Sequence, residues 1–136
     1  MKLSIIISFI AVAVLITACS KTNSQLKEGY LPVTKCQSFN VGEGILTVCL
    51  DSVLNDSRCP SNSICVWQGL ATARFSVSEN NKAHTITLAT RNFGLYRRDT
   101  IVEGFRIEFI NLAPQRKDET PVNYNDYIAE LKVTKQ

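Results

Sequence analysis

The chain has 136 residues, a formal net charge of +3 and 20% charged residues. This length fits one domain with a single hydrophobic core. The net charge is too small to favour nucleic acid, or strong attraction to anionic lipid, so no nucleic-acid partner is expected.

The N-terminus is typical of an export signal. Lys2 precedes an apolar run from Ile5 to Ile16 that only Ser8 interrupts. The run is shorter than the about 20 apolar residues that cross a bilayer, and small residues follow it. We therefore expect residues 1–18 to be a signal peptide that is removed on export.

The four residues Ile16-Thr17-Ala18-Cys19 resemble a bacterial lipobox. The resemblance implies cleavage before Cys19, a diacylglyceryl thioether on its sulfur and a third acyl chain on its amine. Two or three chains attach a protein lastingly, because each buried CH₂ contributes about 0.8 kcal/mol. The alternative is an ordinary secretory signal with a coincidental cysteine.

The residues after the lipobox bear on the address. Inner-membrane retention is typical of an Asp at the position of Ser20, so the same resemblance implies the outer membrane, on its periplasmic or surface face, if the cell is Gram-negative. Residues 19–30 are expected to be the lipidated cysteine and a polar tether, and 31–136 a single disulfide-bridged β domain.

Four further cysteines, an even number in an exported chain, predict two disulfides: Cys36, Cys49, Cys59 and Cys65. Thiol catalysts or zinc ligands are the alternatives. A redox pair usually has two intervening residues, whereas Cys59 and Cys65 have five between them.

The mature chain is expected to be mainly β. Apolar residues alternate over short runs, and no stretch keeps a helical period for three turns. The pattern predicts about seven antiparallel strands in a sandwich or small barrel, at residues 32–40, 45–54, 64–78, 83–90, 100–102, 105–112 and 126–134.

Turn chemistry sets the register of a first hairpin. Val41-Gly42-Glu43-Gly44 can form a two-residue type II′ turn with Gly42 at its first position. Counting outward places Cys36 opposite Cys49 in a non-hydrogen-bonded pair, with Cα atoms about 4.5 Å apart, which is within disulfide reach. The predicted pairs are therefore Cys36–Cys49 and Cys59–Cys65.

A second hairpin is predicted around Asn80-Asn81, because asparagine tolerates a left-handed backbone. This register pairs Glu79 with Lys82 and Val77 with His84. It places His84, the chain's single histidine, on the apolar face. We expect a packed histidine with one satisfied nitrogen, in preference to a catalytic base or a metal ligand.

A loop at residues 91–98 is the leading surface candidate. It mixes aromatic with basic residues on a rigid β scaffold, and tyrosine and arginine are enriched at interface anchors. The candidate binding residues are Phe93, Tyr96, Arg97 and Arg98. The alternative is a solvated loop whose two aromatic rings pack back onto the core.

Residues 56–60, Asp-Ser-Arg-Cys-Pro, are followed by Cys65, Trp67 and Gly69. This pattern resembles one in small, largely uncharacterised bacterial lipoproteins, and the tail is also similar, with Leu112, Pro114, Tyr127, Ala129, Leu131 and Val133. The resemblance implies a compact β domain with a disulfide-closed loop, and no activity. Trp67 is expected to be a buried anchor at the start of a strand, with a sugar- or peptide-stacking role as the alternative.

We therefore expect a non-enzymatic binding module of the cell envelope, with a protein or a glycan as partner and no cofactor. An inhibitor or immunity protein that caps an envelope-directed enzyme is one alternative, and a purely structural subunit is another. A glycan hydrolase would need two carboxylates about 5–9.5 Å apart, drawn from Asp51, Asp56, Glu103 and Glu108. A calcium site at Asp51, Asn55 and Asp56 is disfavoured, because the spacing matches no EF-hand loop.

Overall fold

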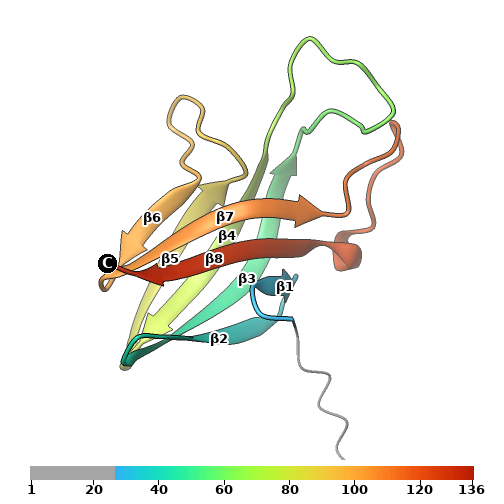
Figure 1. The fold of residues 1–136 in the computed structure, drawn as a ribbon. Coiled ribbons are helices and arrows are strands. Elements are labelled where there is room, and N and C mark those ends of the chain that lie inside the picture. The colour runs from blue at the N-terminus through green and yellow to red at the C-terminus, as the bar shows by residue number, and fades with distance from the viewer. Residues whose placement is uncertain (1–26) are drawn as a thin grey trace, which may run out of the picture.

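The computed structural model describes residues 27–136, so the expected signal peptide, Cys19 and residues 20–26 lie outside the described residues. Eight strands form two four-stranded antiparallel sheets (Figure 1). Within residues 27–136 no strand pairing joins one sheet to the other. The domain is therefore a sandwich, which resolves the choice between a sandwich and a small barrel.

Each sheet contains strands from both halves of the chain. The first sheet has the order β1 (Tyr30–Pro32), β8 (Ile128–Lys135), β7 (Phe105–Ala113) and β6 (Asp99–Val102). The second has the order β2 (Cys36–Val41), β3 (Gly44–Asp56), β4 (Ala71–Glu79) and β5 (Lys82–Ala89). A short 3₁₀ turn, η1 (Tyr124–Asp126), precedes β8.

The core lies between the two sheets. Alternate residues of β4 and β7 point inward and are buried, as period-two strands with one covered face require. The rings of Phe75 and Phe109 meet across the sheets edge to face, with centroids 5.3 Å apart. Phe105 and Ile107 are fully buried beside them. This packing fixes the scaffold from which the loops project.

Both predicted hairpin registers are confirmed. Val41 pairs with Gly44 and Cys36 with Cys49, and Gly42 has the positive φ of +63° expected at its turn position. In the second hairpin Glu79 pairs with Lys82, across Asn80 and Asn81 in the left-handed region. Turn residues and alternation agree in each case, so neither register can slip without moving apolar side chains to solvent.

Both predicted disulfides are present. Cys36–Cys49 joins β2 to β3 with Cα atoms 3.9 Å apart, and Cys59–Cys65 closes a loop with Cα atoms 5.9 Å apart. The first bridges the two strands next to the point where the chain enters the domain. The second lies in the longest connection of the β2–β5 sheet.

Two predicted strands are wrong in extent. The run 32–40 is interrupted at Thr34, whose φ of +65° breaks the extended backbone and sends β1 and β2 into different sheets. The run 64–78 becomes a strand only from Ala71, and residues 57–70 form a loop. Gly69, with φ of +64°, turns the chain at the base of this loop. β1 starts at Tyr30, at the predicted boundary between the tether and the domain.

The two long connections that follow β3 and β5 project from the same side of the sandwich (Figure 1). Residues 57–70 link β3 to β4, and residues 90–98 cross from β5 to β6. β6 is the edge strand farthest from β1 in its sheet, and β5 is the edge strand farthest from β2 in the other. The chain enters at β1, on the other side of the molecule in Figure 1. The loops therefore project away from the N-terminal end of the domain.

Candidate functional site

The base of loop 57–70 is closed by backbone pairing. The amide of Ser57 donates to the carbonyl of Leu70 over 3.0 Å, and the amide of Cys59 donates to the carbonyl of Gln68 over 3.0 Å. The Cys59–Cys65 disulfide then closes the outer part. The base is therefore rigid, and residues 61–67 form an exposed tip on it.

A buried ion pair holds this base to the rest of the domain. Arg58 donates to both carboxylate oxygens of Asp56, from Nε to Oδ1 and from Nη2 to Oδ2, each over 2.7 Å. The side chains are only 9% and 6% exposed. Tyr127 donates its hydroxyl to Oδ2 of Asp56 over 3.0 Å. We call these three residues the Asp56 clasp. The Asp and the Arg of the Asp-Ser-Arg-Cys-Pro motif therefore have a structural role.

The remaining donors of Arg58 reach the end of β7. Its Nη1 donates to the carbonyl of Leu112, and its Nη2 to that of Pro114 over 3.0 Å. Nearly every polar atom of this buried side chain is thus satisfied, as burial of a charge requires. The clasp therefore joins segments that lie far apart in the sequence.

The clasp shifts the pKa of two of its members. Burial acts to raise the pKa of Asp56, but the hydrogen bonds and charge of Arg58, with the Tyr127 hydroxyl, outweigh it, so the pKa is lowered. Burial, and then the hydrogen bond to Asp56, raise the pKa of Tyr127. Asp56 is therefore held ionised, which suits a structural acceptor and disfavours a proton donor.

The segment after β7 braces the loop from below. Gln115 donates from Nε2 to the carbonyl of Cys59 over 2.8 Å, and Arg116 donates from Nη2 to the carbonyl of Arg58 over 3.2 Å. The amide of Ser61 donates to the carbonyl of Arg116 over 2.9 Å. These contacts fix the loop tip relative to the β7–β8 connection.

Gly69 allows the two arms of the loop to approach closely. A Cβ at this position would overlap the carbonyl oxygen of Ser57 and crowd the backbone of Arg58. Any residue with a side chain would therefore force the two arms of the loop apart at this position.

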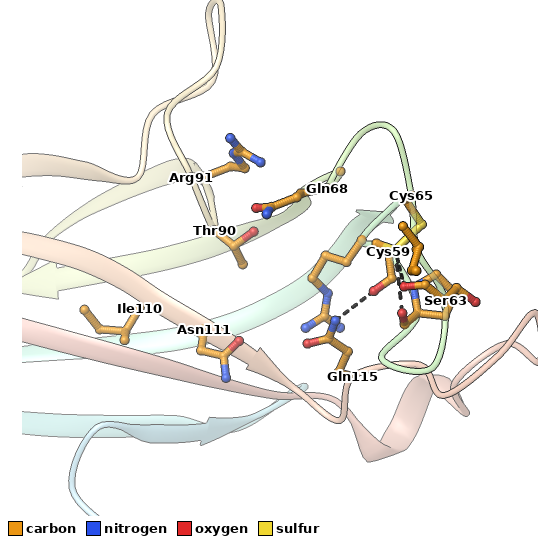
Figure 2. Close-up of a pocket in the computed structure, with 13 residues that line it drawn as sticks. Cys59, Ser63, Cys65, Gln68, Thr90, Arg91, Ile110, Asn111 and Gln115 are labelled. Atoms are coloured by element: carbon orange, nitrogen blue, oxygen red, sulfur yellow. Dashed lines mark hydrogen bonds between the residues drawn. A yellow bond between two sulfur atoms is a disulfide. The ribbon is translucent and has the colours of Figure 1, made fainter.

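A bulge in β7 shapes the floor of an open cleft. Phe109 pairs with Leu131 and Asn111 with Glu130, so Ile110 is an extra residue without a partner in β8. Bulges commonly redirect side chains, and here Ile110 and Asn111 line the cleft (Figure 2). The cleft has a volume of about 570 Å³, within the range of about 300–1,000 Å³ typical of ligand sites.

The lining of the cleft combines apolar, amide and basic side chains. Gln68 and Arg91 lie on one side and Asn111 and Gln115 on the other, with the Cys59–Cys65 disulfide at the end (Figure 2). Its charged residues are both arginines, and Arg58 is already paired with Asp56. Arg91 has no ion-pair partner among residues 27–136 and is the available cation of the cleft.

An exposed apolar surface adjoins the cleft, and we call it the apolar rim. The rings of Trp67 and Phe93 meet with centroids 4.5 Å apart, which joins the two projecting loops. The guanidinium of Arg91 lies over the Trp67 ring, 5.3 Å from its centroid. The rim consists of six residues whose side chains are 44% exposed or more: Ile64, Val66, Trp67, Phe93, Leu95 and Tyr96.

The position of Trp67 corrects one prediction. It was expected to be a buried anchor at the start of a strand, but it lies in the loop and is 44% exposed. The clasp and Gly69 hold this part of the chain away from the sheets, so the apolar alternation around Val66 and Leu70 does not produce a strand. The ring packs against the neighbouring loop instead of the core.

The loop 91–98 contains a small turn of its own. Phe93 and Tyr96 exchange backbone hydrogen bonds of 3.2 and 2.9 Å, which places Leu95 at the tip, 96% exposed. Neither aromatic ring belongs to the core cluster. Phe93 and Tyr96 therefore contribute to the rim and do not pack back onto the core.

The two arginines of this loop have different surroundings. Arg97 donates from Nη1 to the carbonyl of Gly94 over 3.0 Å, within its own loop. Arg98 lies against β7, with Nε 3.3 Å from the Phe109 carbonyl and 3.4 Å from a carboxylate oxygen of Glu108. Of the two arginine side chains, that of Arg98 is the one bonded to the scaffold, whereas Arg97 contacts it through its backbone carbonyl, which accepts from the Ala89 amide over 2.8 Å.

His84 lies outside this site, at the far end of the β4–β5 hairpin. Its predicted register opposite Val77 is confirmed, but its side chain is 41% exposed instead of packed. The ring Nε2 lies 3.0 Å from Oε1 of Glu103, and Lys82 donates to Oε2 over 3.1 Å. These contacts, that of Lys82 first, lower the pKa of Glu103. The predicted satisfied nitrogen is present, and its partner comes from the β6–β7 turn.

The carboxylates considered for hydrolysis do not line the cleft. Asp56 is in the clasp and Glu103 is at the β6–β7 turn. Asp51 accepts a hydrogen bond from the Ser76 hydroxyl over 2.6 Å, and Glu108 lies beside Arg98. Within residues 27–136, no three His, Cys, Asp or Glu side chains are grouped so as to hold a metal ion.

Local sequence patterns missed Gln68, Asn111 and Gln115, because they come together only through the β7 bulge and the loop braces. The Asp-Ser-Arg-Cys-Pro motif was a usable signal for the position of the site, because its Asp56 and Arg58 form the clasp and its Arg58, Cys59 and Pro60 line the cleft. Comparison with known proteins finds no protein family, no curated protein and no solved structure that matches this chain. No helix in the part of the chain described here has the length and apolarity to cross a bilayer.

Proposed function

We propose that this protein is a non-enzymatic binding module, held at a bacterial membrane by lipid on Cys19. The anchor rests on the short apolar leader and on the lipobox-like residues 16–19. The mature protein is expected to begin at Cys19 and to carry about two or three acyl chains. Intact-mass analysis of membrane-extracted protein and of a Cys19→Ala variant tests this, and an unmodified Cys19 in the wild type contradicts it.

The apolar rim is the observation that carries the binding function. Isolated apolar residues on a surface are ordinary, but the rim gathers six of them on two loops that meet at the Trp67–Phe93 contact beside a cleft, which is typical of interaction sites. Ile64 and Val66 are fully exposed, although the loop that holds them is braced by a disulfide and by the clasp. A fixed loop that presents apolar side chains to solvent is prepared for a partner at little cost in conformational entropy.

The chemistry of the cleft supports binding over turnover. Its described lining offers amide and guanidinium groups, which orient a ligand, while the four candidate carboxylates are occupied elsewhere. The placement of the loops also fits a binding function. They project from the side of the domain away from β1, where the tether would enter. The rim would then face away from the anchoring membrane.

Site-specific photocrosslinking in living cells tests the binding function. A photoreactive residue at Val66 or Leu95 should capture the same envelope component, because both side chains lie on the rim. Ile101, on β6 and 59% exposed, is the matched control and should not capture it. Equal capture from Ile101, or none from either rim position, contradicts a binding site here. Substrate turnover that is lost in a Gln115→Ala variant contradicts the non-enzymatic part.

A second candidate function is that of an inhibitor or immunity protein, and the projecting, braced loop 57–70 favours it. Such a loop could enter the cleft of an envelope-directed enzyme without needing to be ordered on binding. If this is the function, the component captured from Val66 is an enzyme, and adding the purified protein lowers its activity. A captured enzyme whose activity is unchanged contradicts this candidate and leaves the binding module in place.

A further inference from the structure

Arg91 gives the proposed site a charge preference. It lines the cleft and also lies over Trp67 of the rim, so it connects the polar and apolar parts of the site. Among the charged residues of the described lining, Arg91 alone lacks a carboxylate partner. Stacking on an indole ring leaves the edge of a guanidinium free to donate two hydrogen bonds to a carboxylate.

The amide side chains define what else a ligand must offer. Gln68 and Asn111 lie on opposite sides of the cleft (Figure 2), and neither side-chain amide has a hydrogen-bond partner within residues 27–136. Each such amide has two donors and one acceptor oxygen. Peptide groups of an extended chain offer the complementary pattern of one donor and one acceptor per residue.

The rim distinguishes a peptide from other polar anions. Ile64 lines the cleft and is fully exposed, and the Trp67–Phe93 pair stands next to Arg91. Branched aliphatic and aromatic side chains match the apolar side chains of a protein partner. A free phosphate or a small carboxylate would make no use of this surface.

We propose that the cleft binds an extended, acidic segment of a partner protein, with an aspartate or glutamate on Arg91 and a neighbouring apolar side chain on the Trp67–Phe93 pair. The proposal deepens the binding function above and rests on it. The carboxylate pairs with a cation that is partly desolvated against Trp67, which gives specificity for acidic sequences. The position of the loops opposite β1 makes a lipid surface the less favoured occupant.

Selection of a displayed peptide library on the processed protein, as cells export it, tests the proposal. The peptides enriched on the wild type should contain an aspartate or glutamate close to a large apolar residue. Their affinity for an Arg91→Glu variant should be about tenfold lower or more, which is about 1.4 kcal/mol. Arg74→Glu is the matched control, because Arg74 is exposed on β4, outside the cleft, and the change in charge is the same.

Three outcomes overturn the proposal: enriched peptides with no excess of acidic residues, no enriched class at all, or equal losses in the Arg91 and Arg74 variants. Binding to vesicles of anionic phospholipid that Arg91→Glu abolishes, without peptide binding, assigns the site to a membrane and also overturns it. Circular dichroism and disulfide mapping confirm that each variant is folded. Capture from Val66 in cells combined with any of these outcomes refutes the acidic segment alone, whereas failure of both experiments refutes the binding module as well.

Discussion

Arg58 grips the carboxylate of Asp56, two residues before it, through two parallel hydrogen bonds of 2.7 Å each. Both side chains are almost completely buried. The carbonyls of Leu112 and Pro114 accept hydrogen bonds from Arg58, and Tyr127 donates one to Asp56. Such bidentate, charge-assisted pairs have the most specific geometry of protein hydrogen bonds. The most recognisable motif in the sequence is therefore the fastening of the loop that carries the proposed site.

Breaking the clasp from one side should be strongly destabilising. Arg58→Met leaves the Asp56 carboxylate buried without its counter-charge, so we expect a loss of about 3–5 kcal/mol in the free energy of unfolding. Arg106→Met is the matched control, since Arg106 pairs with Asp99 over 2.9 Å at a site where the side chains are 48% and 31% exposed, and should cost less than about 1 kcal/mol. Urea denaturation measures both, and similar losses would refute the structural role of the clasp.

The clasp should also give the protein a characteristic acid sensitivity. The folded-state pKa of Asp56 is lowered, below the about 3.9 of an unfolded chain, so ionised Asp56 stabilises the fold above that value. This contribution is lost as the pH falls through the folded-state pKa. The stability difference between wild type and Asp56→Asn should thus be constant at neutral pH and shrink below about pH 4.

Tyr127→Phe gives an independent check on that pH dependence. It removes one hydrogen bond that lowers the pKa of Asp56 and so brings the folded-state pKa closer to that of the unfolded chain. The acid-dependent loss of stability should therefore be smaller, and should end at a higher pH, than in the wild type. Denaturant titrations at a series of pH values measure the shift. A wild-type advantage over Asp56→Asn that stays unchanged down to pH 2 would show that Asp56 is not the responsible group.

Substitution of Gly69 tests the close approach at the base of loop 57–70. Gly69→Ala adds a Cβ that overlaps the Ser57 carbonyl, so the arms of the loop must separate. We expect a loss of about 1–3 kcal/mol beyond that of Gly94→Ala, which has a similar φ of +55° but no atom within 4 Å of the added carbon. Limited proteolysis should then cut the loop faster in the Gly69 variant only. Equal behaviour of the two variants is the contrary result.

The two disulfides should differ in their effects on stability and on binding. On the chain-entropy account, replacing both Cys36 and Cys49 by Ser costs about 3 kcal/mol, and replacing Cys59 and Cys65 costs about 2 kcal/mol, because the second loop is shorter. Only the second replacement should weaken capture from Val66, since it frees the tip. Weaker capture in the Cys36/Cys49 variant at a temperature where it is folded would argue against a locally braced site.

Local sequence signals predicted the hairpins well, because their information is local. Gly42, Asn80 and Asn81 set the turns, and alternating side chains then leave a single register, including the Cys36–Cys49 pair. The strand predicted over residues 64–70 was wrong, because non-local contacts decide the structure of this segment. Its alternation is typical of a strand, but a positive φ at Gly69 and the clasp, whose members Asp56 and Tyr127 are 71 residues apart, override it.

The candidate site was predictable only in part. Trp67, Phe93 and Tyr96 were identified from their residue types, and the structure brings the first two into contact. The cleft itself depends on the extra residue Ile110 and on the reach of Gln115 to the carbonyl of Cys59, 56 residues away. Neither leaves a periodic or compositional trace, so the polar half of the site emerges only in three dimensions.

The braced base of loop 57–70 is separate from its exposed tip. Exposed apolar side chains at the tip can therefore be exchanged without altering the contacts of the base. Ile64 and Val66 are fully open to solvent, while the anchoring of the loop relies on other positions, among them Asp56, Arg58 and the Cys59–Cys65 disulfide. New side chains at these two positions would change the proposed binding surface and leave the anchoring of the loop intact.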